Sequence, residues 1–184
     1  MRGRNMRTHA VLSALGRDRI GLADELAAAM KRRNLEIEDT RMATLQGQFA
    51  VMLHVRGKRD DMTRLSADLD KVASQLRCQM KLDSIKAGRS AGAMPEFLIE
   101  SFCPGAGGLG AVTAVLKRHD INIKALKTEA EAIPWSSKMA FHLTARVSAR
   151  SARSAARLRE ELRKLEKEND LDIVIKPGPS KVGA

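Results

Sequence analysis

THAVLSALGRDRIGLADELAAAM (residues 8–30) decides the fold, because it predicts a strand, a turn flanked by glycines and an amphipathic helix in direct succession. Residues 8–15 form a short, largely apolar run of strand length. Leu22, Leu26 and Met30 then recur at helical spacing. In the turn between them, Asp18 is placed to cap the helix through its side chain. The segment therefore predicts a βα unit.

The residues that follow extend this unit to the order βαββαβ. Residues 35–43 and 48–55 are predicted strands joined by a short turn at Gly47, and residues 78–85 alternate as a half-buried strand does. A single helix is predicted between them. Its apolar stripe consists of Met62, Leu65, Leu69, Val72 and Leu76.

The same order recurs in the second half of the chain. Gly21 and Gly107 are 86 residues apart (107 − 21), and Ile37 and Ile123 are separated by the same number of residues (123 − 37). We therefore predict an α+β protein of two tandem ferredoxin-like βαββαβ domains, with antiparallel sheets and helices on one face. The expected parts are a flexible basic arm at 1–7, domains at 8–86 and 95–176, a linker at 87–94 and a flexible tail at 177–184.

Composition excludes several classes of protein. Hydrophobic residues make up 43% of the 184 residues, which argues against a disordered chain, and no apolar run reaches the length of a membrane span. The net charge of +11 raises the question of nucleic acid, but aromatic residues make up only 3%, so stacking platforms for single strands are scarce. The late helix that carries many of the basic residues also holds Glu160, Glu161, Glu166 and Glu168, so much of its surface is predicted to be a mixed, solvated face. We expect no direct sequence-specific nucleic-acid binding, no membrane association and, since two separate cysteines suit a reducing compartment, a cytoplasmic location.

The sequence contains few of the residue patterns that are typical of catalytic sites. The four histidines are scattered without metal-ligand spacing, so we expect no enzyme activity, no metal and no cofactor. One motif points elsewhere, because GAGGLG (residues 105–110) matches the dinucleotide fingerprint GxGxxG. That fingerprint requires alternating βα units, whereas two strands, a helix and a strand follow here. A flexible turn that admits a neighbour or ligand is the favoured interpretation.

The turn at residues 16–21 is the most informative candidate site. It brings backbone N–H groups to a helix N-terminus, where a carboxylate is favoured, and Arg17 and Arg19 add positive charge. Glu36 and Asp39 lie beyond the far end of the helix and are suited to an ammonium group. The poles lie about 18 Å apart within one module, so a neighbouring module would complete the pocket. The alternative remains open that Asp18 only caps, the arginines are solvated and the glycines only turn.

GRDRIG (residues 16–21) followed by NLEIEDTRM (residues 34–42) resembles the ACT domain. The tandem arrangement resembles the glycine cleavage system transcriptional repressor family, and the resemblance spans residues 8–175. It implies that amino acids bind between modules, through the turn after the first strand and a polar residue at the start of the second strand. The candidate ligand-binding residues are Gly16, Arg17, Asp18, Arg19, Ile20, Gly21, Glu36, Asp39 and Asn122.

Two departures from the family pattern concern the ligand. Glu36 stands where the family often has asparagine, and the second turn lacks the Asp-Arg pair. The expected function is a non-enzymatic regulator that binds a small-molecule amino acid and controls a partner, such as a transcription factor of glycine cleavage genes. Exposed sheet edges favour a homodimer. The alternative is a ligand-free, partner-binding scaffold that uses its basic surface.

Overall fold

The computed structural model describes residues 7–86, 95–104, 107–134, 139–169 and 171–178. The chain divides into two compact domains, Met1–Arg89 and Ser90–Ala184. The predicted arm (except Arg7), the linker and most of the tail lie outside the described residues. No helix in the described part of the chain is both long enough and apolar enough to cross a membrane.

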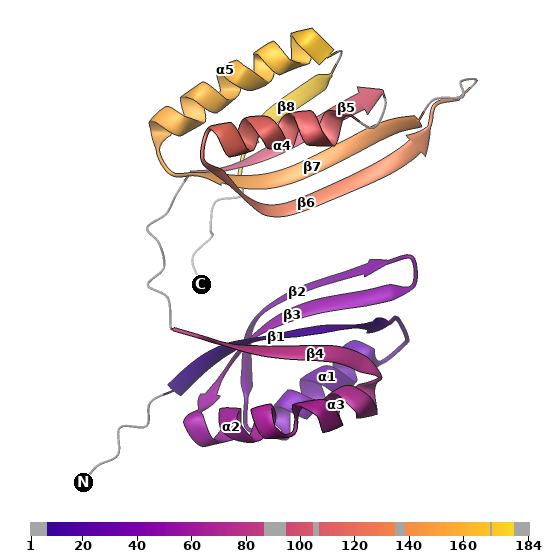
Figure 1. Ribbon diagram of the computed structural model, residues 1–184, viewed down its shortest axis with the longest axis vertical. Helices are drawn as coiled ribbons and strands as arrows, with labels where there is room; N and C mark the ends of the chain where they lie inside the picture. Colours follow the sequence, from indigo (N-terminus) through magenta and orange to yellow (C-terminus); the bar gives the residue numbers. More distant parts are fainter. Residues whose placement is uncertain (1–6, 87–94, 105–106, 135–138, 170, 179–184) are drawn as a thin grey trace. The chain divides into compact units, whose positions relative to one another are not determined.

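The first domain has the predicted βαββαβ order with one helix divided (Figure 1). Its antiparallel sheet has the order β2-β3-β1-β4, so the first and third strands lie in the centre. Its elements are β1 (Arg7–Arg17), α1 (Leu22–Lys31), β2 (Glu36–Leu45), β3 (Gln48–Lys58), α2 (Arg59–Ala67), α3 (Leu69–Leu76) and β4 (Cys78–Ile85).

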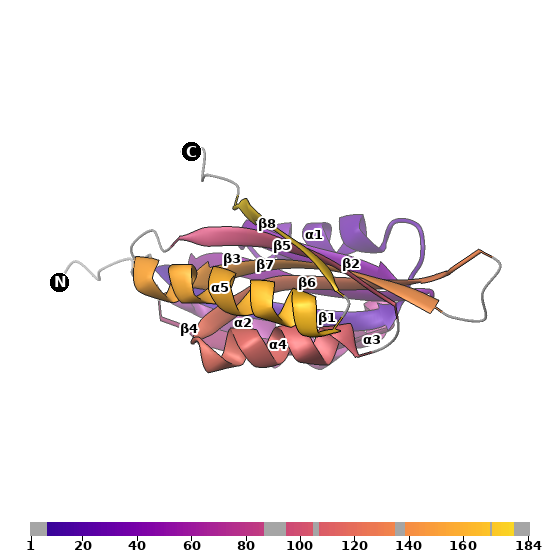
Figure 2. The same ribbon diagram turned by 90° about the horizontal axis from the view of Figure 1, so that it is seen from above.

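The second domain repeats this arrangement with sheet order β6-β7-β5-β8. Helices α4 and α5 lie side by side on one face of the sheet (Figures 1 and 2). The antiparallel sheet lacks the parallel strands of the dinucleotide-binding fold. Residues 108–110 of the GAGGLG motif begin α4 rather than forming the predicted turn, and residues 105–106 lie outside the described residues. The elements are β5 (Glu96–Pro104), α4 (Gly108–Arg118), β6 (Ile121–Ala132), β7 (Met139–Ala149), α5 (Ala152–Asn169) and β8 (Asp172–Pro177).

Each sheet buries one face under its helices. Along β1, Ala10, Leu12 and Ala14 are buried, whereas the intervening residues face away from the helices. Most of the largest fully buried side chains are aliphatic in both domains, and they include Leu12, Leu65, Ile99 and Leu158. The core therefore follows the alternation of the strands and the stripes of the helices.

The structure corrects two sequence predictions about element ends. The helix predicted from the stripe at residues 62–76 is two helices, because Asp68 has the non-helical angles φ −92° and ψ 2°. Strand β1 continues through Gly16 and Arg17, which were expected to lie in the turn. Gly16 pairs with Phe49 of β3 and Cys78 of β4, and these two ladders carry the strand past its apolar part.

Candidate functional site

The turn between β1 and α1 consists of residues 18–21. Its start is fixed by the Asp18 N–H, which donates to the Gly47 carbonyl at 2.9 Å. The expected cap is wrong: Gly21 occupies the N-cap position of α1, and no side chain of the described residues caps the helix. Gly21 has φ +85°, a left-handed conformation that glycine adopts without strain, whereas aspartate pays a steric cost there. Asp18 lies three residues too early to reach the cap position.

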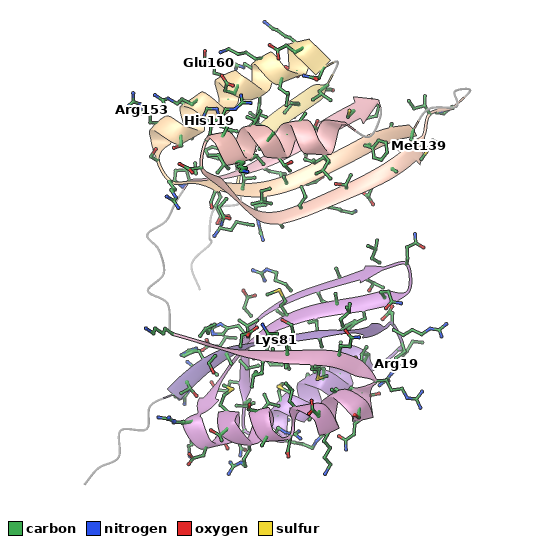
Figure 3. The ribbon with its side chains drawn as sticks, viewed as in Figure 1. Arg19, Lys81, His119, Met139, Arg153 and Glu160 are labelled. Atoms are coloured by element: carbon green, nitrogen blue, oxygen red, sulfur yellow. The ribbon has the colours of Figure 1, made fainter. Side chains whose placement is uncertain are left out.

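Arg19 projects from this turn (Figure 3), but its guanidinium group contacts the adjacent helix α1. It donates two hydrogen bonds to Glu25, at 2.6 and 2.5 Å. This contact lowers the pKa of Glu25 and raises the pKa of Arg19. Ile20, next to it, is fully exposed. The turn therefore presents one apolar side chain to solvent and a guanidinium that already has a partner.

The predicted acidic pole lies at the other end of the sheet. Glu36 forms an ion pair with Arg7 at 3.2 Å and a second with Arg56, and Asp39 pairs with Arg41 at 2.5 Å. Glu36 is opposite Arg56, which is seven residues along β3 from the partner of Gly16. That separation corresponds to about 24 Å, so the first domain does not bring its two predicted poles together.

Asn122, at the start of β6, lines a cavity of about 570 Å³. Ser148 lies directly opposite Asn122 on β7, and its hydroxyl is buried without a hydrogen-bond partner among the described residues. Charged side chains of both signs line the same cavity. The full lining is Thr113, Leu116, Lys117, Asp120, Ile121, Asn122, Ile123, Ser148 and Arg150.

The first domain has a cavity at the equivalent place, with a volume of about 340 Å³. In both domains the residue two before the predicted polar position has a positive φ, 56° at Asn34 and 54° at Asp120. In the first domain the polar position is occupied by Glu36, which its arginine partners already neutralise. This cavity is lined by Arg7, Asn34, Glu36, Gly57, Lys58, Asp60, Asp61 and Arg64.

Gly16 lines a third cavity, of about 630 Å³, with Cys78 and Arg77. Burial raises the pKa of the Cys78 thiol, so this sulfur is held as a thiol rather than a thiolate. Among the predicted turn residues, Gly16 is the one that contributes to the lining of this cavity.

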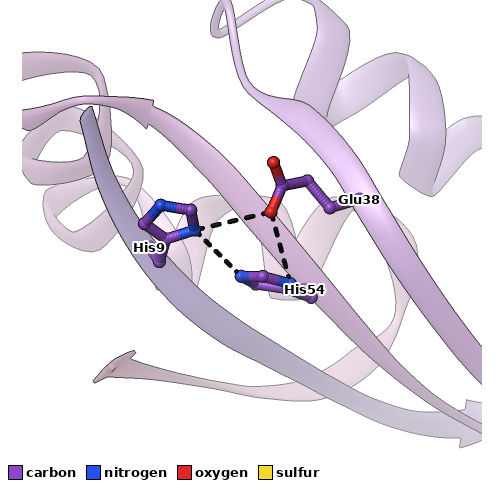
Figure 4. Close-up of side chains that lie close together, drawn as sticks. All are labelled: His9, Glu38 and His54. Carbon is purple, nitrogen blue, oxygen red and sulfur yellow. Dashed lines mark hydrogen bonds and ion pairs between the residues drawn. The ribbon is translucent and has the colours of Figure 1, made fainter. Parts of the chain in front are cut away.

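Sequence reasoning missed two features. Ser148 was not selected, although its position opposite Asn122 follows once β6 and β7 are paired in register. The histidines also seemed scattered, yet His9 and His54 lie 3.0 Å apart, nitrogen to nitrogen, beside Glu38 (Figure 4). The alternation of the strands predicts that the His9 and His54 side chains point away from the core. Their proximity, however, depends on the register in which β1 and β3 pair.

The comparisons with known proteins agree with this architecture. Residues 8–83 match the sequence family described as the ACT domain. A solved structure of an unknown protein from Galdieria sulphuraria has 26% identity and a TM-score of 0.83, and the alignment covers 95% of this chain and 100% of that one. A protein proposed to be a glycine cleavage system transcriptional repressor has 19% identity and a TM-score of 0.74, with 95% and 99% covered.

No curated protein matches the chain. The family match covers the first domain, and the second domain repeats the same strand order and helix placement. The chain therefore consists of two ferredoxin-like domains in tandem, and the first of them is similar in sequence to the ACT domain.

Proposed function

We propose that this protein is a regulatory amino-acid sensor whose ligand occupies the Asn122 cavity of the second domain. The observation that carries the proposal is the buried Ser148 hydroxyl, which lies opposite Asn122 and has no hydrogen-bond partner within the part of the chain that the structure describes. Buried polar groups are nearly always hydrogen-bonded, so an unpaired hydroxyl beside a cavity favours a polar ligand.

The charges around this cavity suit a zwitterion. Lys117 and Arg150 are cations that can bind a carboxylate, and Asp120 is an anion that can bind an ammonium group. Asn122 and Ser148 can donate to and accept from either end. The volume of about 570 Å³ falls within the ordinary range for small-molecule sites.

The predicted turn at residues 16–21 enters this proposal as a contribution from a neighbouring module. Within the first domain it lies about 24 Å from Glu36 by strand length, so one domain does not complete a pocket from both. A homodimer would supply the missing neighbour. In that arrangement the turn residues would contact a ligand held mainly by another module.

We further propose that ligand binding controls a partner protein. The match to the ACT domain, a family of regulatory domains, supports this role. The fold similarity to a protein proposed to be a glycine cleavage system transcriptional repressor makes glycine the first amino acid to test and a transcription factor the first class of partner. The proposed function requires no catalysis.

The test is a thermal-shift and calorimetric titration of the full chain with the twenty amino acids. A ligand at a hundred times its dissociation constant stabilises the protein by about 2.7 kcal/mol, which is readily measured. Asn122→Ala and Ser148→Ala should both reduce the shift. Ser101→Ala is the matched control, because Ser101 is also buried, its hydroxyl has no partner among the residues that the structure describes, and it does not line this cavity. Equal ligand-induced shifts of the melting temperature in all three variants would show that the ligand binds at another site.

A second candidate, the ligand-free scaffold, is favoured by one surface of α5. Arg159, Arg163, Lys164 and Lys167 line a shallow hollow of about 420 Å³ there, with Glu160 among them. A basic surface of this kind binds acidic partners with a steep dependence on salt. If no amino acid shifts the melting temperature and a captured partner is released between low and moderate salt, this second function replaces the first.

A further inference from the structure

Three side chains that the amino-acid sensor does not use meet on the open face of the first sheet (Figure 4). His9 Nδ1 lies 3.0 Å from His54 Nε2, and Glu38 Oε2 lies 3.5 Å from Nδ1 of each histidine. One ligand atom from each residue falls within 4.8 Å of the other two. The cluster draws one residue from each of β1, β2 and β3.

A β-bulge brings the glutamate into this cluster. The pairing of β2 with β3 passes from Ile37 to Asp39 with a register shift, so Glu38 is the extra residue of the bulge. Bulges re-aim side chains, and here the carboxylate is directed over the neighbouring strand. His54 pairs with Val11, two residues from His9, so the histidines are diagonal neighbours on one face of the antiparallel pair.

The carboxylate is held in a fixed orientation by a second ion pair. Arg56 Nη1 lies 2.8 Å from Glu38 Oε1, which leaves Oε2 directed at the histidines. Arg56 is in turn bound by Glu36, so its charge is compensated on both sides. Outer groups of this type orient the ligands of metal sites. The His9 and Glu38 side chains are only 17% and 28% exposed, so both are partly shielded from solvent.

We propose that His9, Glu38 and His54 form a binding site for a divalent transition-metal ion of the zinc class, with a further coordination position open to solvent. Two imidazoles and a carboxylate are a common donor set for zinc. Ligand atoms around a tetrahedral zinc lie about 3.3 Å apart, and with His54 binding through Nε2 the His9 Nδ1 atom lies 3.0 Å from that nitrogen and 3.5 Å from Glu38 Oε2. Small side-chain rotations would therefore complete the coordination.

The second domain supplies an internal contrast. Its second strand carries a bulge at the same place, with Lys124 as the extra residue between Ile123 and Ala125. By the strand registers, Arg146 occupies the position of His54 and Glu96 that of His9. Two of these three groups are cations, which would repel a metal ion. The proposal therefore predicts one ion for each chain, bound in the first domain.

The same three side chains also form a metal-free cluster, in which the His9 and His54 rings share a hydrogen bond between Nδ1 and Nε2 and Glu38 Oε2 lies 3.5 Å from Nδ1 of each ring. The experiment separates these cases. The untagged full chain is stripped with a chelator and titrated with Zn²⁺ against a chromophoric competitor. Co²⁺ is then substituted as a spectroscopic probe of coordination geometry. We expect one equivalent of Zn²⁺ and the intense visible bands of tetrahedral or five-coordinate Co²⁺.

Single substitutions identify the ligands. His9→Gln, Glu38→Gln and His54→Gln should each weaken Zn²⁺ binding by more than about 100-fold, because loss of even an outer group costs about 10–100-fold. His142→Gln is the matched control, since His142 is 51% exposed and lies 3.7 Å from Glu131 on the second sheet. Circular dichroism of each variant checks folding, and Glu38→Gln retains the size of the original side chain.

The proposal is overturned if the stripped chain binds no Zn²⁺, or if the three variants bind it as tightly as the His142→Gln control. Neither result bears on the Asn122 cavity, because amino-acid binding is measured by its own variants in the other domain.

Discussion

Gly16 packs against Cys78 so closely that a β-carbon on Gly16 would lie 2.7 Å from the Cys78 sulfur and 3.0 Å from the Arg77 carbonyl oxygen. The contact joins β1 to β4 beside a cavity at the end of the sheet. Gly16 is therefore required by packing as well as by any ligand.

Gly16→Ala should destabilise the first domain by about 2 kcal/mol, because extra atoms in a packed site force the surrounding groups apart. Its melting transition should fall by roughly 10 °C in differential scanning calorimetry. Cys78→Ala in the same chain should recover part of the loss, because it removes the sulfur that the new methyl group meets. An unchanged transition in Gly16→Ala would show that the strands separate more easily than this packing implies.

Gly110→Ala should have the opposite effect. Gly110 lies inside α4, and a β-carbon there meets nothing within 4 Å among the described residues. Alanine restricts the unfolded chain and favours the helix, so the free energy of unfolding of the second domain should rise by about 0.5–1 kcal/mol. Chemical denaturation measures this change, and a loss of stability would contradict the open space around Gly110.

Ser148→Ala should stabilise the ligand-free protein while it weakens amino-acid binding. The Ser148 hydroxyl is buried and has no hydrogen-bond partner in the described segments, and such a group costs about 1–3 kcal/mol. The melting temperature without ligand should therefore increase, and the ligand-induced shift should decrease. A parallel fall of both quantities would instead indicate that Ser148 is needed for the fold.

The Cys78 thiol should react slowly with disulfide reagents in the folded protein. It is buried and its pKa is raised by that burial, so little thiolate is present at neutral pH. In a chain that carries Cys103→Ser, so that Cys78 is the remaining thiol, labelling followed by absorbance should show one rate that increases with denaturant as the first domain opens. Gly16→Ala should accelerate this labelling, since it destabilises the same site. Rapid labelling of the native protein would contradict the burial.

The Arg19–Glu25 pair should make a small, pH-dependent contribution to stability. Its hydrogen bonds lower the Glu25 pKa in the folded state, so the contribution is present above the unfolded pKa and is lost as the pH falls through the folded pKa. Glu25→Gln should therefore lower the melting temperature slightly at neutral pH and not in acid. High salt should shrink the difference, because both groups are exposed.

The sequence by itself determined the elements, their repetition and the faces they bury. Alternation along residues 8–15, the stripes of the helices and the 86-residue offset are local or periodic signals that survive without knowledge of packing. The two sheets with one buried face each agree with that prediction. The break at Asp68 was not predictable, because the apolar stripe continues across it.

Only the tertiary structure decided which side chains meet. Arg19 pairs with Glu25, Asn122 is opposite Ser148, and His9, Glu38 and His54 converge from three strands. These contacts depend on strand register and on a bulge of one residue, and a register shift of one residue would send a strand's side chains to the other face. Register arises from the packing of the whole domain, so no local pattern in the sequence contains it.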